Sequence, residues 1–239
     1  MASSSAGNCY ILYTDSEVLI LEAGVRFSTV QKELNYNLTK VKGVIVTHLH
    51  GDHSKYLSQF VNAGISCLAD ESVFEHHGLK GSNLITAEHQ KEYKLGGFNV
   101  KPFSVEHDVP TFGFLLDHEK MGKTVFITDT GEVNYSFKGL SNVIIEANYG
   151  EQIIYNNVLN GVIHPVHGER VAKSHLSLEK CAEWLGLMDL SKVNNIVLVH
   201  LSSQNSDAEI FKKRIEESFC KKTHIAKKGL DIEFGKYPF

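Results

Sequence analysis

The chain has 239 residues, of which 42% are hydrophobic and 22% are charged, and its formal net charge is −4 at pH 7. This composition excludes a largely disordered chain, and the negative charge argues against a protein that coats nucleic acid. No apolar run approaches the roughly 18 residues of a membrane span, and the first residues lack the pattern of a signal peptide. We therefore expect a cytoplasmic protein without a membrane partner.

Cysteine usage agrees with a reducing compartment. The four cysteines form no CxxC pair, and an intracellular chain of this size does not need disulfides. We expect all four thiols to be reduced and buried. They are Cys9, Cys67, Cys181 and Cys220.

The first half of the chain alternates between strand-like and helix-like runs. CYILYT and VLILEA, separated by a polar turn, predict a β-hairpin. Apolar residues over 26–38 recur at helical spacing and lead into the strand GVIVT. Residues 54–63 predict an amphipathic helix closed by Gly64, and short strands with one short helix follow over 65–117.

The second half repeats this order. TVFITD, NVIIEAN and NIVLVH predict strands, and residues 178–187 and 207–219 predict helices before a last short strand. Two sheet-plus-helix halves packed together are the expected architecture. Residues 149–173 have the least regular pattern, so we expect a long loop there, of the kind that often carries function.

The motif THLHGDH directly follows the strand GVIVT. Alternate side chains of an extended segment share one side, so His48 and His50 point the same way. Gly51 permits a sharp turn that brings Asp52 and His53 back toward the same point. Imidazole and carboxylate groups suit zinc, and also iron or manganese. A single His at a strand end is usually structural, but four such groups within six residues predict a metal site.

A site for two metals needs further ligands. His107 ends the run VKPFSVEH, Asp129 ends TVFITD, and His200 ends NIVLVH. Each follows a strand-like run, as expected if the ligands gather along one edge of the sheets. The resulting assignment places His48, His50 and His107 on one metal, Asp52, His53 and His200 on the other, and Asp129 between them.

These residues resemble the metallo-β-lactamase superfamily of dinuclear hydrolases. The segments SSSAGN, EHDVPTFGFLL, ITDTGEV, IIEANYG and VLVHLSSQNSD are similar to its YycJ-like branch, which is related to transfer RNase Z and to phage anti-Pycsar phosphodiesterases. The resemblance implies an α/β fold, a four-layer αββα sandwich forming a single domain over residues 1–239. It also implies two divalent metals, zinc before manganese.

The chain departs from this branch in one place and from true β-lactamases in another. Where the branch commonly has Asp in a DAG turn, this chain has Glu22 in LEAG, and Glu22 is not a ligand in our assignment. The cysteine ligand of many true β-lactamases has no candidate beside the motif, which disfavours that activity.

Two residues are candidates for direct roles in catalysis. Asp52, a metal ligand, should be indispensable for hydrolysis. His175 in SHLSLEKCAEWL resembles the His of the HST-type segment of transfer RNase Z, which makes it the candidate general acid that protonates the leaving group. The alternative for His175 is a structural residue at a helix N-terminus, beside Ser174 and Ser177.

The remaining histidines carry less weight. His164 and His167 could form a rim on the substrate side, although a solvated loop is favoured. Asn148 and Tyr149 could reach a base or ribose, and packing accounts for them equally well. Five others are predicted to be surface or capping residues: His76, His77, His89, His118 and His224.

Two divalent metals outweigh the charge of the two Asp ligands, so the site should attract an anion such as a phosphate. The resemblance implies a phosphodiesterase, and we predict a small 3′,5′-cyclic mononucleotide as substrate, as in the anti-Pycsar relatives that degrade an immune signal. The acidic, compact chain favours this substrate. Eight Lys or Arg residues from Lys212 onward favour the alternative, a YycJ-like DNA or RNA nuclease.

Two further functions are weighed and disfavoured. A nucleotide sensor without activity would be expected to lack metal ligands, and none of the seven is missing. A thioester hydrolase does not match the later segments, which resemble phosphodiesterases. Relatives are commonly dimeric, so the resemblance implies a homodimer, in the host cytoplasm if the gene is carried by a phage.

Overall fold

The computed structural model describes residues 3 and 6–237. The chain forms two compact units, each built from separate stretches. The first unit contains the described residues up to Ser104 together with 109–114 and 227–231, and the second contains 105–108, 115–226 and the described residues from 232. The strands form two sheets, of five and seven strands.

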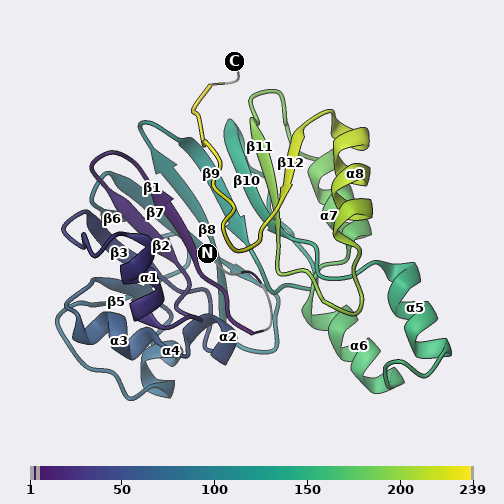
Figure 1. Ribbon diagram of the computed structural model, residues 1–239, viewed down its shortest axis with the longest axis horizontal. Helices are drawn as coiled ribbons and strands as arrows, with labels where there is room; N and C mark the ends of the chain where they lie inside the picture. The colour runs from purple at the N-terminus through teal and green to yellow at the C-terminus, as the bar shows by residue number, and fades with distance from the viewer. Residues whose placement is uncertain (1–2, 4–5, 238–239) are drawn as a thin grey trace. The chain divides into compact units, whose positions relative to one another are not determined.

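The first unit contains the five-stranded sheet, with the strand order β1-β2-β3-β4-β5 (Figure 1). Its first two strands form the predicted antiparallel hairpin, and the others run parallel to β2. All four residues of β2 are buried, which explains its unbroken apolar sequence VLIL. The strands are β1 (Tyr10–Tyr13), β2 (Val18–Leu21), β3 (Val41–Ile45), β4 (Cys67–Ala69) and β5 (Leu84–Thr86).

Four short helices belong to this unit: α1 (Phe27–Glu33), α2 (Gly51–Ser54), α3 (Leu57–Asn62) and α4 (Glu71–His76). Two of them differ from the prediction. The helix predicted over 26–38 ends at Glu33, because Asn35 and Tyr36 adopt positive φ angles of 48° and 58°. The helix predicted over 54–63 is two helices, because the Tyr56 N–H donates to the Ala23 carbonyl, 3.0 Å away, instead of to its own helix.

The first unit also holds β6 (Tyr93–Leu95), most of β7 (Phe98–Val105) and the first half of β8 (Thr111–His118), in the order β6-β7-β8. β6 and β7 are antiparallel. They turn at Gly96, whose φ of 62° explains the Gly-Gly pair at this point.

The second unit continues from β8 with the order β8-β9-β10-β11-β12, and its last four strands are parallel. Every residue of β10 and β11 is buried, which explains the apolar runs VII and IVLV within them. Because the four strands are parallel, their carboxyl ends share one edge of the sheet. The strands are β9 (Gly122–Ile127), β10 (Leu140–Glu146), β11 (Asn195–Val199) and β12 (Lys222–Ile225). Helix α7 (Leu178–Gly186) precedes β11, and α8 (Ala208–Phe219) lies between β11 and β12 in the chain.

The prediction of a long loop over residues 149–173 is wrong. This segment forms two helices, α5 (Glu151–Leu159) and α6 (Pro165–Ser174), which lie together in Figure 1. Gly161 has a φ of 69° in the turn between them, and Pro165 occupies the first turn of α6, where its missing N–H costs nothing. Both residues therefore mark helix boundaries here, although they read as loop signals in the sequence.

The mixed α/β organisation with two sheets agrees with the predicted fold class. No helix within the described part of the chain combines the length and apolarity that crossing a lipid bilayer requires.

Candidate metal centre

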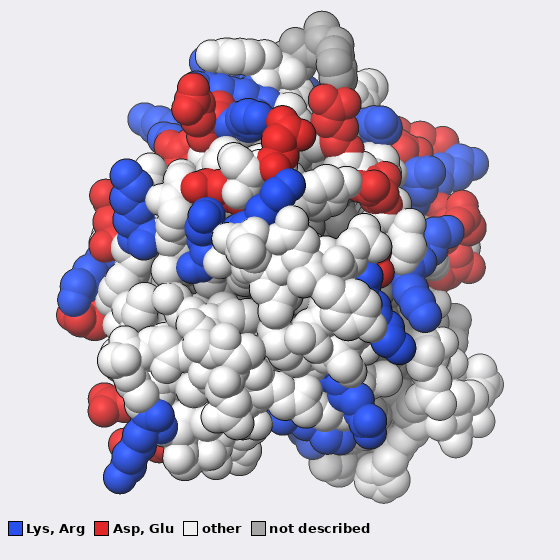
Figure 2. Space-filling model, turned by 60° about the vertical axis from the view of Figure 1, so that its left-hand side comes forward, with Lys and Arg blue, Asp and Glu red and all other residues white. Residues whose placement is uncertain are grey.

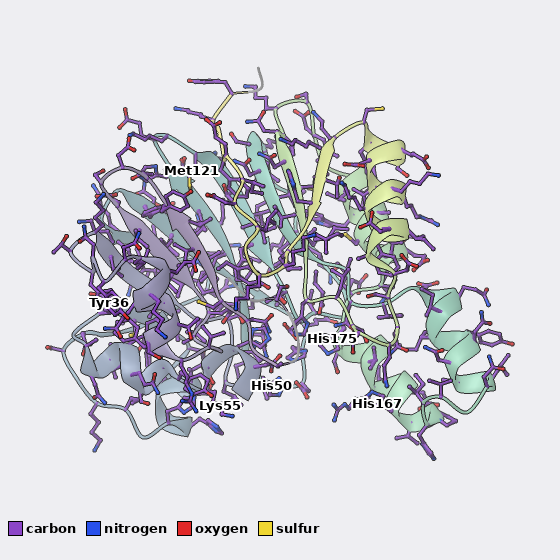
Figure 3. All side chains as sticks on the ribbon, viewed as in Figure 1. Tyr36, His50, Lys55, Met121, His167 and His175 are labelled. Carbon is purple, nitrogen blue, oxygen red and sulfur yellow. The ribbon has the colours of Figure 1, made fainter. Side chains whose placement is uncertain are left out.

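The predicted metal motif lies in the first unit, between β3 and α2. His48 and His53 are buried, and His50 is partly exposed at the N-cap of α2, where Figure 3 labels it. α2 is a single turn that begins at Gly51. This turn directs Asp52 and His53 back toward the end of the strand, as the sequence predicts.

Within this motif, four side chains form two close pairs. His48 Nε2 lies 3.0 Å from His50 Nδ1, and Asp52 Oδ2 lies 3.2 Å from His53 Nε2. Two atoms that bind one zinc ion at about 2.0–2.2 Å lie about 3 Å apart. The chemistry and spacing of both pairs therefore fit metal ligation.

Two residues that the sequence assignment left out support this motif. Glu22 is fully buried and accepts a hydrogen bond from the Thr47 hydroxyl (2.7 Å), and its carboxylate lies 3.4 Å from His53 Nδ1. The Asn8 amide donates to Asp52 Oδ2 at 3.2 Å. Glu22 therefore lies beside Nδ1 of His53, the side from which a carboxylate orients a histidine's other nitrogen toward a metal.

The backbone of the LEAG turn after β2 is in direct contact with the backbone of the metal motif. The Ala23 N–H donates to the His53 carbonyl at 2.7 Å. A Cβ atom on Gly24 would lie 1.8 Å from the Asp52 carbonyl oxygen and 2.6 Å from the Asn8 nitrogen. Only glycine fits at this position, so the turn fixes the backbone of the motif.

In the second unit, three polar residues lie at or just beyond the carboxyl ends of the parallel strands β9, β10 and β11. Glu146 is the last residue of β10, His200 comes directly after β11, and Asp129 is the second residue after β9. Asp129 and His200 have φ angles of 51° and 55°. Non-glycine residues at positive φ are uncommon and are often found at functional sites. All three side chains are buried.

Glu146 is the centre of a cluster that includes the candidate general acid. Its Oε1 lies 2.8 Å from Nδ1 of His175 and 2.8 Å from Nδ1 of His200, and its Oε2 accepts from the Leu176 N–H at 3.0 Å. Asp129 Oδ1 lies 3.3 Å from His175 Nδ1. These ligand-type atoms all lie within 4.8 Å of one another, so the cluster is compact enough to bind a cation.

The charges in this cluster shift two pKa values in opposite directions. Burial lowers the pKa of His175, but the charge and hydrogen bond of Glu146 outweigh burial and raise it above its ordinary value. Burial raises the pKa of Glu146, but the positive charge of His175 and its hydrogen bond lower it overall. The pair therefore favours a charged imidazolium beside a carboxylate.

His107 is held by the last turn of α6. Its Nδ1 donates to the Ser174 carbonyl at 2.9 Å, and its ring centroid lies 5.8 Å from that of His175. The other nitrogen, Nε2, lies 3.1 Å from Asp108 Oδ1. With Nδ1 fixed by the carbonyl, Nε2 is the nitrogen that would bind a metal. His107 and His175 are thus both positioned by the carboxyl end of one helix.

The less weighted candidates have mixed outcomes. Tyr149 is buried in a small apolar cluster, which agrees with the packing alternative, whereas the Asn148 amide donates to the His200 carbonyl and so contacts a predicted ligand. His118 is buried rather than exposed. His164 caps α6 instead of lying in a loop, and His167 lies within that helix, where Figure 3 labels it.

His77 is the C-cap of α4, as predicted, and it is half-buried because its Nε2 lies 2.8 Å from the Ser54 hydroxyl in the helix of the metal motif. One further correction concerns a thiol. Cys220 is exposed at the end of α8, although the sequence predicted four buried thiols. The other three cysteines are free and buried, as predicted.

A family model described as a β-lactamase superfamily domain matches residues 22–201. This span covers most of the chain and includes all seven predicted ligands. The chain belongs to the metallo-β-lactamase superfamily. The fold class predicted from the sequence, an α/β fold of the four-layer αββα sandwich type, is confirmed by this match and by the similar solved structures, and the mixture of helices with two sheets agrees with it.

Curated relatives cover nearly the full chain at low identity. It is 24% identical to the exodeoxyribonuclease YycJ of Bacillus anthracis over 91% of this chain and 86% of that protein. It is 25% identical to the exodeoxyribonuclease WalJ of Streptococcus pneumoniae over 88% and 83%. The metallo-β-lactamase fold protein YhfI of Bacillus subtilis superposes with a TM-score of 0.69 at 15% identity, over 95% of this chain and 92% of that one.

The superfamily fold and the His and Asp clusters fit a dinuclear metal site. The donors are imidazole nitrogens and carboxylate oxygens, the set that borderline divalent metals prefer. The sequence indicated seven candidate ligands because they are polar residues at or just after the ends of apolar, strand-like runs. It did not indicate Glu146, since a single Glu inside the buried run NVIIEAN carries no spacing signal of its own.

Proposed function

We propose that this chain is a dinuclear metal-dependent phosphodiester hydrolase whose substrate is a small cyclic nucleotide. The proposal keeps the seven ligands of the sequence assignment and zinc as the first metal, with manganese as the second choice. The observation that carries it is the buried Glu146 carboxylate bound to His175, because this pair provides a charged proton donor beside a metal-type cluster. Superfamily membership supports the hydrolytic chemistry.

When bound, the metals would supply Lewis acidity and lower the pKa of a coordinated water. Two divalent ions carry more positive charge than Asp52, Asp129 and Glu146 cancel, so the site would attract a phosphodiester anion. The protein's own task is then to orient the ligands and to deliver a proton to the leaving alkoxide.

His175 is suited to that task. Its Nδ1 faces Glu146, which leaves Nε2 to give a proton to the leaving oxygen. The side chain is 21% exposed, whereas Glu146 is fully buried, so a substrate can approach the ring but not the carboxylate. Glu146 is therefore a positioning residue, and it keeps the imidazolium form populated.

A cyclic mononucleotide is the proposed substrate for three reasons. The sequence resembles the anti-Pycsar branch, which degrades such molecules as an immune signal. The chain is acidic overall and has no long insertion that would act as an arm for RNA. On the face in Figure 2, acidic and basic side chains are interspersed instead of forming a broad basic surface. A polymeric nucleic acid usually requires such a surface.

A nuclease acting on DNA or RNA is the second candidate. The relatives that cover most of the chain are named exodeoxyribonucleases. The second unit also carries basic residues close together on α8 and β12, including Lys212, Lys213, Arg214 and Lys222.

A substrate panel separates the two candidates. Purified protein is incubated with zinc or manganese and with 3′,5′-cyclic mononucleotides, cyclic dinucleotides or end-labelled linear DNA. Conversion of a cyclic mononucleotide to a monophosphate, lost in Asp52→Ala and kept in the exposed control Asp15→Ala, is the expected result. Rapid loss of DNA with cyclic mononucleotides intact would establish the nuclease instead, and no hydrolysis of any diester would overturn the proposal.

A further inference from the structure

The hairpin formed by α5 and α6 has an unusual surface. From Gln152 to Gly168 the sequence QIIYNNVLNGVIHPVHG contains no Lys, Arg, Asp or Glu, although these residues make up 22% of the chain. Charged side chains normally cover the exposed faces of helices, because they interact favourably with water. This segment lies entirely within the second unit.

The outer side of this hairpin exposes large apolar side chains. Tyr155 is 58% exposed, Leu159 66%, Val162 57% and Val166 66%. They are four of the nine large apolar side chains that are exposed in the described part of the chain. We call these four residues the hairpin patch. Clustered exposure of this kind is typical of a surface that binds another molecule.

The fold of the hairpin does not account for the patch. A separate set of apolar residues, Ile154, Ile163 and Val171 with Tyr149, packs on the inner side as a small core. Gly168 lets α6 approach α5 closely, because a Cβ there would lie 3.0 Å from Val158. The inner residues hold the two helices together, so the patch is left for another partner.

The chemistry of the patch points to the kind of partner. Nucleic acids and anionic membranes are bound mainly through Lys and Arg, which are absent here. Depletion of charge together with an exposed aromatic ring is typical of the core of a protein interface. The exposed polar side chains beside the patch are the amides of Gln152, Asn156 and Asn160 on α5 and the imidazoles of His164 and His167 on either side of Val166, and Glu169 and Arg170 follow one turn further along α6.

We propose that the hairpin patch binds the same patch on a second copy of this chain, forming a two-fold symmetric dimer. A symmetric interface brings identical residues together, so it must not repel itself. The four patch side chains meet this condition, because they carry no charge and two copies of them can bury apolar area against each other, while Glu169 and Arg170 at the border have opposite charges. This proposal names the surface of the homodimer that the resemblance implies.

The position of the patch links the dimer to the site. α6 carries Val166 near its start and ends at Ser174, whose carbonyl accepts from His107, with His175 as the next residue. A dimer contact that fixes α6 would therefore restrict the motion of both His107 and His175. This link rests on the proposed function, whereas the dimer itself does not.

The experiment measures mass by sedimentation velocity over a wide range of protein concentrations, which requires no activity. The parent should be a dimer. The double variants Leu159→Glu with Val166→Glu, and Leu159→Lys with Val166→Lys, should each weaken association on the order of 100-fold, because like charges would face each other. The control Leu187→Glu alters an equally apolar residue that is 80% exposed outside the patch, and it should remain dimeric.

Mixing the two double variants tests the symmetry. Opposite charges would then face each other, so a mixed dimer should form although each variant alone is monomeric. Circular dichroism checks folding, and the uncharged variant Tyr155→Ser with Val162→Ser should also weaken the dimer. A monomeric parent, dimeric patch variants, equal disruption by Leu187→Glu, or failure of the mixed dimer would each overturn the proposal.

Discussion

Oε1 of Glu146 lies 2.8 Å from Nδ1 of His175, and the carboxylate is fully buried while the ring is partly exposed. The same oxygen lies 2.8 Å from Nδ1 of His200. One carboxylate therefore orients the candidate proton donor and a predicted metal ligand together. A substitution at Glu146 should affect both the proton transfer and the metal site.

The variant Glu146→Gln tests this role. Gln has nearly the same shape, but it removes the negative charge that stabilises the imidazolium form of His175. We expect kcat for phosphodiester hydrolysis to fall about 10- to 100-fold, the usual effect of removing a partner of this kind. Steady-state kinetics measure it, and Glu183→Gln, an exposed residue of α7, is the matched control. An unchanged kcat in Glu146→Gln would remove the positioning role.

The variant His175→Gln should reveal which step the imidazole serves. A general acid matters for a poor leaving group such as an alkoxide, but not for p-nitrophenolate, which leaves without a proton. We expect kcat to fall about 10²- to 10⁴-fold with a nucleotide substrate and far less with bis(p-nitrophenyl) phosphate. The control is His167→Gln, on the exposed side of the preceding helix. Equal losses with both substrates would argue for a purely structural His175.

The sequence predicts this molecule best where local patterns determine the outcome. Strand ends carrying His48, Asp129 and His200 were recognisable, because a polar residue after an apolar run stands out. Glu146 was not, since its partners His175 and His200 are distant in sequence and only the fold brings them to it.

The errors in helix boundaries have a similar cause. α5 and α6 were missed because apolar residues are exposed on both helices as well as buried between them, so the sequence shows no clear helical spacing of apolar residues. The break at Tyr56 depends on the Ala23 carbonyl, which belongs to a turn more than 30 residues earlier. Such tertiary hydrogen bonds leave no mark on a local sequence pattern.

Glu22 should govern metal affinity through His53. In the variant Glu22→Gln, the buried carboxylate next to His53 Nδ1 becomes a neutral amide, so the ring is held less firmly. We expect the affinity for zinc to fall about 10- to 100-fold. Competition with a chromogenic chelator measures the affinity, and the exposed Glu33→Gln at the end of α1 is the control. Parent-like affinity in Glu22→Gln would show that this contact is structural only.

Thiol reactivity should differ sharply among the cysteines. Burial raises the pKa of Cys9 and of Cys67 to about 12 and raises that of Cys181 as well, so these thiols stay protonated. Only the exposed Cys220 should react quickly with Ellman's reagent in the native protein. All four should react after unfolding in guanidinium chloride. The variant Cys220→Ser should have no fast thiol, and a fast thiol in that variant would contradict the burial of the other three.

His224 should make stability depend on pH. Burial, together with the nearby charges of Lys222 and Lys212, lowers its pKa in the folded protein below the ordinary value of about 6.5 that it regains on unfolding. Between these two pKa values the unfolded chain binds more protons, so acidification favours unfolding and stability rises with pH across this window. The variant His224→Gln keeps a donor for Asn195 but does not titrate. We therefore compare the unfolding free energies of parent and variant by urea denaturation. The difference should be more favourable to the parent at pH 7.5 than at pH 5. A difference that is constant with pH would show that His224 titrates alike in both states.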